Sequence, residues 1–323
     1  KSLADFDWHQ SRMLRSQQWD QVSQRFSWKQ EQGVLMMAPD VVYDALLANE
    51  RSLDAPEIID VEPGETVAIR WLAGSAFMSF FLDLGDLEGE LLRTDANPVE
   101  PISGSVFQLA LAQRLTLRVK LPEEPGIFPL LALGERSNLR CGVVLRSHPK
   151  LSVPALAPQT DQWTGRLDFT QDKQLRAQRP LAVRAADNTI PVALTGPAPK
   201  YTWGLNDRFY PYRDPYWIEE GQRVEMVFSN PTPMGHPMHL HGHEFQILEL
   251  DGEPLAGAMR DTVYVPKGGT CRIAFDANNP GIWAFHCHIS YHHARGMFNV
   301  VAYRSADLSW WNPSGFKHEH LPF

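Results

Sequence analysis

The chain has 323 residues, more than one domain of ordinary size, which favours two domains. A hydrophobic content of 43% with 25 prolines is typical of a loop-rich globular protein and excludes intrinsic disorder. The net charge of −8 argues against a nucleic-acid-binding surface, which needs clustered Lys and Arg. No apolar run approaches the roughly 20 residues that span a bilayer, so no transmembrane segment is expected.

The first forty residues fit no regular pattern. Residues 5–28 are polar and rich in Gln, with aromatic residues at intervals. We interpret residues 1–40 as an irregular or partly helical segment that connects to a missing upstream domain. The chain begins at Lys1 without an apolar leader, so we expect that any targeting peptide has been removed. Residues 43–51 could form a short helix or an extended segment.

Polar and apolar residues then alternate with Gly and Pro between the runs, which predicts strands. Residues 61–70 indicate a strand entry, a Pro-Gly turn and an alternating strand, and residues 218–227 repeat that design. Each copy is followed by an aromatic-rich segment and a second turn-and-strand pair, at residues 113–121 and 261–275. The pattern predicts an all-β fold of two sandwich domains related by duplication.

These patterns also predict domain boundaries. The first domain is expected at residues 41–148 and the second at 180–305. Residues 149–179 contain several prolines and little periodicity, as expected of a linker. Residues 306–323 form a tail.

The chain has three cysteines, too few for a disulfide framework. Cys141 and Cys271 lie in apolar or alternating segments and are expected to be small buried residues. Cys287 differs because histidines flank it on both sides.

Eight of the twelve histidines fall into two short clusters. The first is His-Pro-Met-His-Leu-His-Gly-His at residues 236–243, and the second is His-Cys-His-Ile-Ser-Tyr-His-His-Ala-Arg-Gly-Met at residues 286–297. Such density around a cysteine predicts metal binding rather than a set of core histidines.

Strand geometry assigns these residues to two centres. Side chains at positions i and i+2 share one face of a strand, so His286 and His288 face one way and Cys287 the other. One strand would therefore separate two metal centres. His239 and His241 likewise share a face if their segment is extended.

The Cys287 centre needs partners. His292 and Met297 follow it in a loop that can fold back, and His236 can arrive from the first cluster. Two imidazoles, one thiolate and a weak thioether make a blue-copper electron-transfer site. Zinc competes for Cys and His ligands, but Met297 and the flanking histidines favour copper.

The two motifs resemble the third and fourth copper-binding motifs of the laccase-like multicopper oxidases, which have three cupredoxin domains. Residues 279–285 also resemble the family where they precede the cysteine motif, and residues 43–146 resemble its middle domain. The resemblance implies two cupredoxin-like Greek-key β-sandwich domains in tandem, without the family's N-terminal domain.

The resemblance also implies roles for the residues that match the motifs. The implied ligands are His236, Cys287, His292 and Met297 for type 1 copper, His239 for type 2 copper, and His241, His286 and His288 for the type 3 pair. In the family the ring at the His292 position often lies near the surface and admits electrons. Cys287 would pass them through His286 and His288 to the cluster that reduces oxygen. Met297 implies a lower-potential site than the most oxidising laccases.

The trinuclear cluster of the family takes eight histidines, and this chain supplies four. The others normally come from two His-x-His motifs in the N-terminal cupredoxin domain, whereas only His9 and His148 precede His236 here. We therefore expect a complete type 1 site and half-ligated type 2 and type 3 sites, with the missing domain cleaved, omitted or on a separate chain. Two-domain laccases and copper nitrite reductases are disfavoured, because their first domains carry ligands.

Three further histidine features are given minor roles. His293 stands where some bacterial members carry a Glu thought to deliver protons, and a position beside the ligands or at the surface is favoured over a proton relay. His318 and His320 have metal-like spacing in a tail that we expect to be solvated. His243 is expected to be a non-ligand neighbour.

The leading functional hypothesis is an oxidoreductase that couples four one-electron oxidations of phenols, aromatic amines or Cu(I) to reduction of dioxygen to water. Few methionines cluster, only Met36 with Met37 and Met234 with Met238, which favours an organic donor. The alternative is a one-copper electron-transfer protein with no oxidase activity. A scaffold that has lost its ligands is disfavoured by the intact Cys287 set. The resemblance implies a periplasmic or secreted location.

Overall fold

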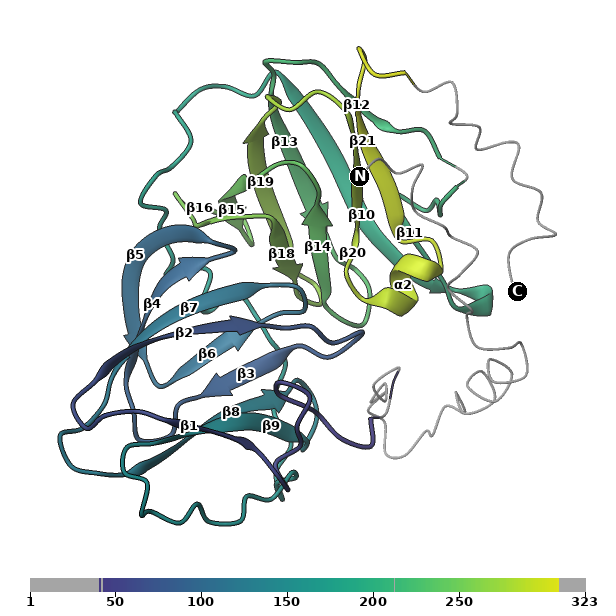
Figure 1. Cartoon of the computed structure of the whole chain (residues 1–323). Helices are drawn as coiled ribbons and strands as arrows, with labels where there is room; N and C mark the ends of the chain where they lie inside the picture. The colour runs from purple at the N-terminus through teal and green to yellow at the C-terminus, as the bar shows by residue number, and fades with distance from the viewer. Residues whose placement is uncertain (1–40, 42, 212, 308–323) are drawn as a thin grey trace. The chain divides into compact units, whose positions relative to one another are not determined.

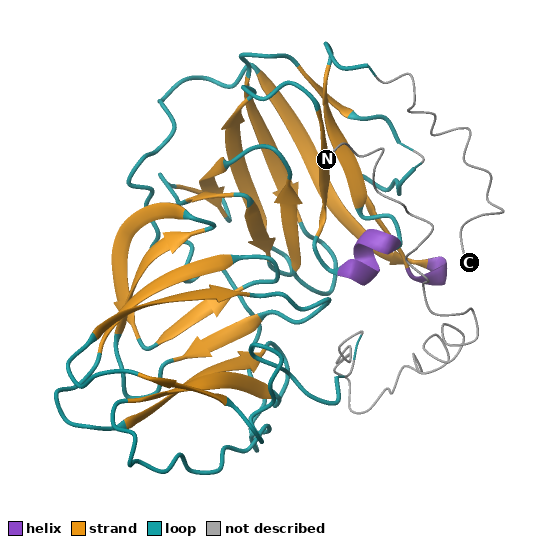
Figure 2. Ribbon diagram, viewed as in Figure 1, coloured by secondary structure: helices purple, strands orange, loops and turns teal. Residues whose placement is uncertain are grey.

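A computed structural model of the chain describes residues 41, 43–211 and 213–307, all within one compact unit, 41–315 (Figure 1). The predicted segment 1–40 and nearly all of the predicted tail lie outside the described residues. Strands dominate the described part, and its two helices are short (Figure 2). Neither helix has the length or the hydrophobicity to cross a bilayer.

The first half of the described chain forms two sheets. Its strands are β1 (Glu57–Asp60), β2 (Thr66–Leu72), β3 (Phe80–Asp83), β4 (Gly89–Thr94), β5 (Asn97–Gly104), β6 (Val106–Leu109), β7 (Arg114–Lys120), β8 (Ile127–Gly134) and β9 (Arg140–Arg146). The strand orders are β1-β9-β8-β3-β6 and β2-β7-β4-β5. Residues 43–51, left open between helix and strand, contain an isolated bridge between Ala48 and Arg51.

The second half forms two more sheets. Its strands are β10 (Asn188–Ala198), β11 (Thr202–Leu205), β12 (Tyr216–Ile218), β13 (Arg223–Ser229), β14 (His236–Leu240), β15 (Phe245–Leu250), β16 (Glu253–Pro254), β17 (Met259–Arg260), β18 (Thr262–Val265), β19 (Thr270–Asp276), β20 (Ile282–Cys287) and β21 (Phe298–Tyr303). The two helices are the 3-10 turn η2 (Pro199–Tyr201) and α2 (Ser290–Ala294). The strand orders are β12-β21-β20-β14-β18 and β11-β10-β13-β19-β15-β16, with β17 on β15.

The two halves share one topology. In each, a short strand pairs in parallel with the last strand of its half, β1 with β9 and β12 with β21. In each, the strand predicted from the repeated motif pairs antiparallel with the strand predicted downstream, β2 with β7 and β13 with β19. The all-β prediction is therefore confirmed, and the design repeated in the sequence recurs in the strand pairing of both halves.

Each half has its own hydrophobic core. The alternation of apolar and polar residues along the strands directs apolar side chains into each core. Along β7, for example, Leu115, Leu117 and Val119 are buried while Arg118 and Lys120 are exposed. One core is built mainly from residues 46–145 and the other mainly from residues 190–303. The predicted domain boundaries remain a prediction.

The predicted linker is held by both cores. Residues 147–187 contain no strand, yet Phe169 packs into the second core and Leu175 into the first. Gln171 Nε2 donates a hydrogen bond to the Gln108 carbonyl, 2.9 Å away. These contacts fix the backbone of the segment, so it is not a free tether between the two cores.

Candidate metal centre

Strand pairing brings the two histidine clusters side by side. β14 and β20 are antiparallel neighbours, with His239 opposite His286 and Met238 opposite Cys287. Residues far apart in the sequence thereby form directly facing pairs, whose side chains point to the same side of the sheet.

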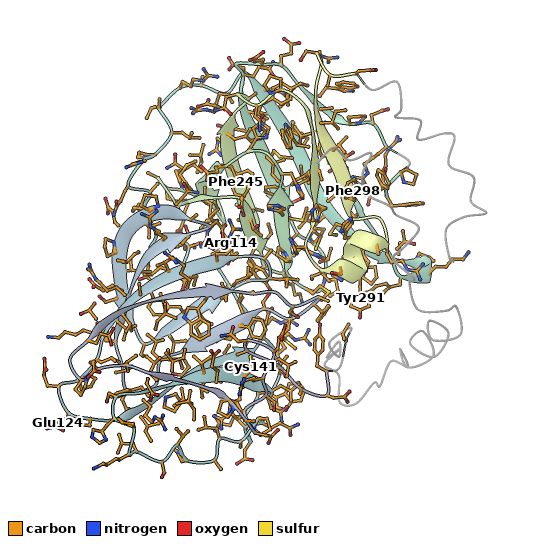
Figure 3. All side chains as sticks on the ribbon, in the orientation of Figure 1. Arg114, Glu124, Cys141, Phe245, Tyr291 and Phe298 are labelled. Atoms are coloured by element: carbon orange, nitrogen blue, oxygen red, sulfur yellow. The ribbon has the colours of Figure 1, made fainter. Side chains whose placement is uncertain are left out.

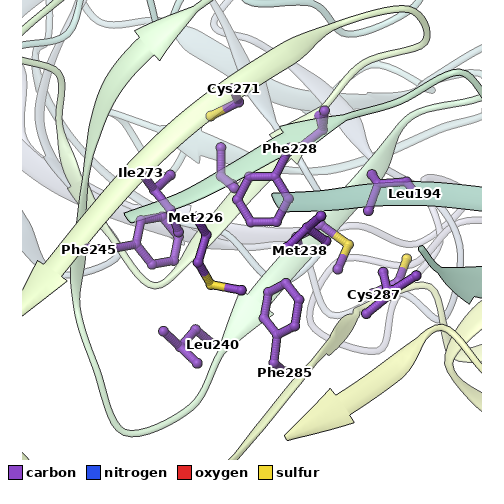
Figure 4. Close-up of a cluster of buried hydrophobic side chains, with 14 of the residues drawn as sticks. Leu194, Met226, Phe228, Met238, Leu240, Phe245, Cys271, Ile273, Phe285 and Cys287 are labelled. Atoms are coloured by element: carbon purple, nitrogen blue, oxygen red, sulfur yellow. The ribbon is translucent and has the colours of Figure 1, made fainter. Parts of the chain in front are cut away.

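The alternation expected along β20 is present. Met238, Leu240, Phe285 and Cys287 belong to the buried core (Figure 4). The rings of His239 and His286 pack instead against each other, with centroids 5.7 Å apart. One peptide segment thus presents a sulfur on one face and an imidazole on the other.

On the core face, three ligand atoms converge. Cys287 Sγ lies 3.7 Å from His236 Nδ1 and 3.8 Å from His292 Nδ1, and the two nitrogens are 3.1 Å apart. One ion held at about 2.0–2.3 Å by a sulfur and two nitrogens separates these atoms by about 3–4 Å. Within the described ranges, no other group of three or more His, Cys, Asp or Glu residues brings its ligand atoms within 4.8 Å of one another.

The segment after β20 supplies the His292 nitrogen of this group. α2 carries His292, which is fully buried. Backbone hydrogen bonds then fold the chain back, from Met297 N to the His292 carbonyl at 3.0 Å and from Cys287 N to the Met297 carbonyl at 3.1 Å. Gly296 between them has φ +109°, a conformation that favours glycine. The loop therefore holds Met297, also fully buried, beside the cysteine.

A hydroxyl fixes the orientation of His236. Thr232 Oγ1 lies 2.7 Å from His236 Nε2 and 2.7 Å from Asn230 Oδ1. A hydroxyl that donates to Asn230 can accept the Nε2 hydrogen of His236. That tautomer leaves Nδ1 unprotonated and facing the Cys287 sulfur.

Replacing Thr232 by valine should weaken metal binding at this centre by about 10–100-fold, because the outer partner of His236 is lost. Titration of the chain with metal, followed by visible absorbance, measures the effect. Thr262→Val is the matched control, since the Thr262 hydroxyl lies 3.0 Å from His239 on the other face. Equal affinities of the Thr232 variant and the parent chain would contradict the assignment.

The environment of the centre disfavours charge unless a cation is present. Burial raises the pKa of the Cys287 thiol. Burial, assisted by neighbouring His292, lowers the pKa of His236 well below its usual value. A bound metal reverses the first effect, since a coordinated thiol loses its proton, and it requires the neutral imidazole that the second provides. One thiolate with two imidazoles therefore fits a soft transition-metal ion such as copper.

The other face gathers four imidazoles. His241 Nε2 lies 3.1 Å from His286 Nε2, and the His239 ring centroid is 4.7 Å from that of His241 and 5.7 Å from that of His288. Burial lowers the pKa of His286 to about 2 and that of His239 to about 4. With these pKa values the His286 and His239 rings are neutral near pH 7, so each can donate a nitrogen lone pair to a metal.

Carbonyl groups set the tautomers on this face. His286 Nδ1 lies 2.9 Å from the Cys287 carbonyl, and His239 Nδ1 lies 2.8 Å from the Asp261 carbonyl. A carbonyl only accepts, so each Nδ1 carries the proton and each Nε2 is free to bind a metal.

The first half of the chain supports this face. The Arg114 guanidinium (Figure 3) binds both carboxylate oxygens of Asp261, at 2.8 and 2.5 Å. Asp261 in turn bonds to His239 through its backbone carbonyl. Such a two-point pair fixes geometry as well as charge, so a residue from β7 orients an imidazole of the second half.

The remaining histidines have other surroundings. His293 stacks on His286 with centroids 4.6 Å apart, and burial lowers its pKa to about 4. His243 Nε2 lies 2.7 Å from the Tyr303 hydroxyl. His9, His318 and His320 lie outside the described residues.

The structure adds one residue to the site. In the family the ring at the His292 position often lies near the surface, and in this chain the ring is 0% exposed. Trp203 of β11 stacks on it, with centroids 3.9 Å apart and planes 26° apart. Trp203 is remote in sequence from both histidine clusters, and no motif links them, so sequence reasoning missed it.

Comparison with known proteins gives the family. Two models described as multicopper oxidase match residues 6–143 and 184–307. MmcO, a multicopper oxidase of Mycobacterium tuberculosis, is 33% identical over 82% of this chain and 51% of its own length. Laccase-1 of Melanocarpus albomyces is 26% identical, over 77% of this chain and 49% of its own length.

The fold agrees with these matches. The crystal structure of Fet3p, a multicopper oxidase that functions in iron import, superposes with a TM-score of 0.67 at 22% identity, over 77% of this chain and 57% of that one. This chain spans about half the length of the curated relatives it matches. It carries a convergent group of one Cys and two His that is consistent with a type 1 copper site, and it belongs to the multicopper oxidase family.

Proposed function

We propose that this chain is the part of a laccase-like oxidase that takes up electrons. A type 1 copper held by His236, Cys287, His292 and Met297 would accept one electron at a time from a small donor. Dioxygen, the final acceptor, would be reduced to water at a trinuclear cluster, to which this chain contributes His239, His241, His286 and His288. A cupredoxin domain with two His-x-His motifs, outside this chain, would supply the other half of the ligands.

The observation that carries the proposal is the two-sided segment at the end of β20. Cys287 Sγ faces the His236 and His292 nitrogens, while the neighbouring His286 ring faces His241 on the opposite side. Only one peptide bond separates the two side chains. Copper, when bound, supplies the one-electron chemistry. The chain's own residues fix the ligand atoms, exclude water from the thiolate and link the two faces covalently.

A phenol or aromatic amine is the favoured donor, with Cu(I) as the competitor. Met238 is 1% exposed and packs in the core, so it is not part of a methionine-rich surface that would capture Cu(I). Met36 and Met37 lie outside the described residues. A periplasmic or secreted location is expected from the family resemblance.

Copper counting tests the proposal. The chain alone should bind one copper tightly, turn intensely blue and consume little or no dioxygen. His239, His241, His286 and His288 would supply only half of the ligands that the trinuclear cluster needs. Elemental analysis, visible absorbance and an oxygen electrode give the three measurements. Four tightly bound coppers with oxidase turnover by this chain alone would contradict the half-cluster assignment.

The second candidate is a one-copper electron carrier. The convergent ligand group on the core face favours it equally, because that group is complete within this chain. Adding a cupredoxin domain that carries two His-x-His motifs separates the two functions. Oxygen consumption that appears only in the mixture supports the oxidase, whereas a blue protein that stays inert supports the carrier.

A further inference from the structure

An electron donor cannot touch the metal ligands directly in this structure. His292 and His236 are each 0% exposed, and so is Cys287. An electron must therefore cross at least one further side chain. Because electron tunnelling falls off steeply with distance, the side chain in closest aromatic contact with a ligand ring is the favoured route.

Trp203 makes that contact. Its indole stacks on the His292 ring at 3.9 Å, and its centroid lies 5.2 Å from the His236 ring in an edge-on arrangement. The indole is itself 0% exposed, so it is not a surface on which a donor could stack. It is thus an internal aromatic bridge to both imidazoles.

The backbone around Trp203 is shaped to hold the indole in place. A Cβ atom at Gly196 would come within 2.6 Å of the indole ring, at a residue whose φ of +129° itself favours glycine. Trp203 N donates to the Arg295 carbonyl, 3.0 Å away, which ties β11 to the end of the loop that carries His292. Stacking is therefore built into the second half of the chain.

Tyr201 extends the aromatic contact outward. Its ring packs edge-on against Trp203, with centroids 5.6 Å apart, and lies 6.1 Å from the His292 ring. Unlike Trp203, Tyr201 is only partly buried. The two rings form a continuous path from a half-buried phenol to a fully buried ligand.

We propose that Tyr201 and Trp203 form the route by which electrons reach the type 1 site, an inference that rests on the proposed function. One electron leaves a phenolic donor and reduces copper(II) to copper(I). The donor releases its proton to solvent, and both aromatic residues end unchanged. The route works through ring contact, so it needs at each position a ring large enough to keep that contact, and it does not need the phenol hydroxyl.

The test uses the full chain loaded with one equivalent of copper, mixed anaerobically with hydroquinone, while loss of blue colour is followed in a stopped-flow instrument. Reduction should slow several-fold in Trp203→Phe and further in Trp203→Leu. Tyr201→Leu should also slow it, while Tyr201→Phe should keep the parent rate. Trp217→Phe, which changes a tryptophan under Arg304, is the matched control and should not slow it.

Two measurements separate a route from a structural role. The reduction potential and the blue absorbance of each variant should stay close to those of the parent chain, so that slower reduction reflects coupling rather than driving force. Copper(II) should quench tryptophan fluorescence less in Trp203→Phe than in Trp217→Phe, since Trp203 contacts a ligand ring.

The outcomes are distinct. Parent rates in both Tyr201→Leu and Trp203→Phe, with the blue band intact, would overturn the route and leave the proposed function standing. If Trp203→Leu loses the blue band, Trp203→Phe and Tyr201→Leu decide the question. If the parent chain showed no blue absorbance after copper is added, the proposed function itself would be contradicted.

Discussion

Replacing Cys287 by serine should abolish the intense blue absorbance of the copper-loaded chain. The colour of such a site comes from charge transfer between a thiolate and Cu(II), and a hydroxyl cannot replace that soft ligand. His236 and His292 would remain, so weak and colourless metal binding can persist. Visible absorbance and the copper content after dialysis measure the change.

Cys271→Ser is the matched control for this variant. Cys271 is a buried free thiol in the same core, opposite Phe228 in the β13–β19 pair, and contacts none of the ligand atoms. The control should keep full colour although it places a hydroxyl in an apolar site. Blue colour retained in Cys287→Ser would refute the assignment of the thiolate.

Replacing Arg260 by leucine should destabilise the folded chain by about 3–5 kcal/mol, because it leaves buried carboxylates without their cation. Arg260 is 0% exposed. Its Nη2 lies 2.6 Å from Asp172 Oδ1 in the predicted linker, and its Nη1 lies 3.8 Å from Asp95 Oδ2 in the first half. Chemical denaturation followed by fluorescence gives the free energy of unfolding.

An exposed ion pair provides the comparison. Arg118 and Glu90 interact on the surface of the first half, with side chains 49% and 40% exposed. Arg118→Leu should therefore change the free energy of unfolding by no more than about 1 kcal/mol. If the two variants lost similar amounts of unfolding free energy, Arg260 would not be the residue that holds the predicted linker against the first half of the chain.

The Asp95 carboxylate shows why this linkage matters. Burial raises its pKa to about 6, against the opposing effect of Arg260. It also accepts hydrogen bonds from the backbone N–H groups of Asp261 and Thr262. The same carboxylate thereby fixes the backbone next to the carbonyl that orients His239.

Local sequence predicted those features that depend on local geometry. Alternation along a strand was enough to place Cys287 and His286 on opposite faces, and the repeated motif was enough to predict β2 and β13. The buried Arg260 pairs, the packing of Phe169 and the stacking of Trp203 join residues far apart in the chain. No periodicity encodes such contacts, because tertiary packing alone brings these side chains together.

The aromatic cover over His292 was not predicted, for a related reason. The cysteine motif predicts that Cys287 and His292 converge. The side chain that covers the His292 ring is Trp203 of β11, which lies outside that motif. Family motifs therefore predicted which side chains converge, and the surrounding fold decided what covers them.

The end of β20 presents a proposed metal ligand on each face, so the length of this segment is constrained. Inserting or deleting one residue between Phe285 and His288 would exchange the two faces, sending an imidazole into the core and the sulfur out of it. A single substitution there would affect one of the two proposed centres, whereas a shift in frame would disable both at once. Variation in length between relatives should therefore accumulate in the surrounding loops and be absent from residues 285–288.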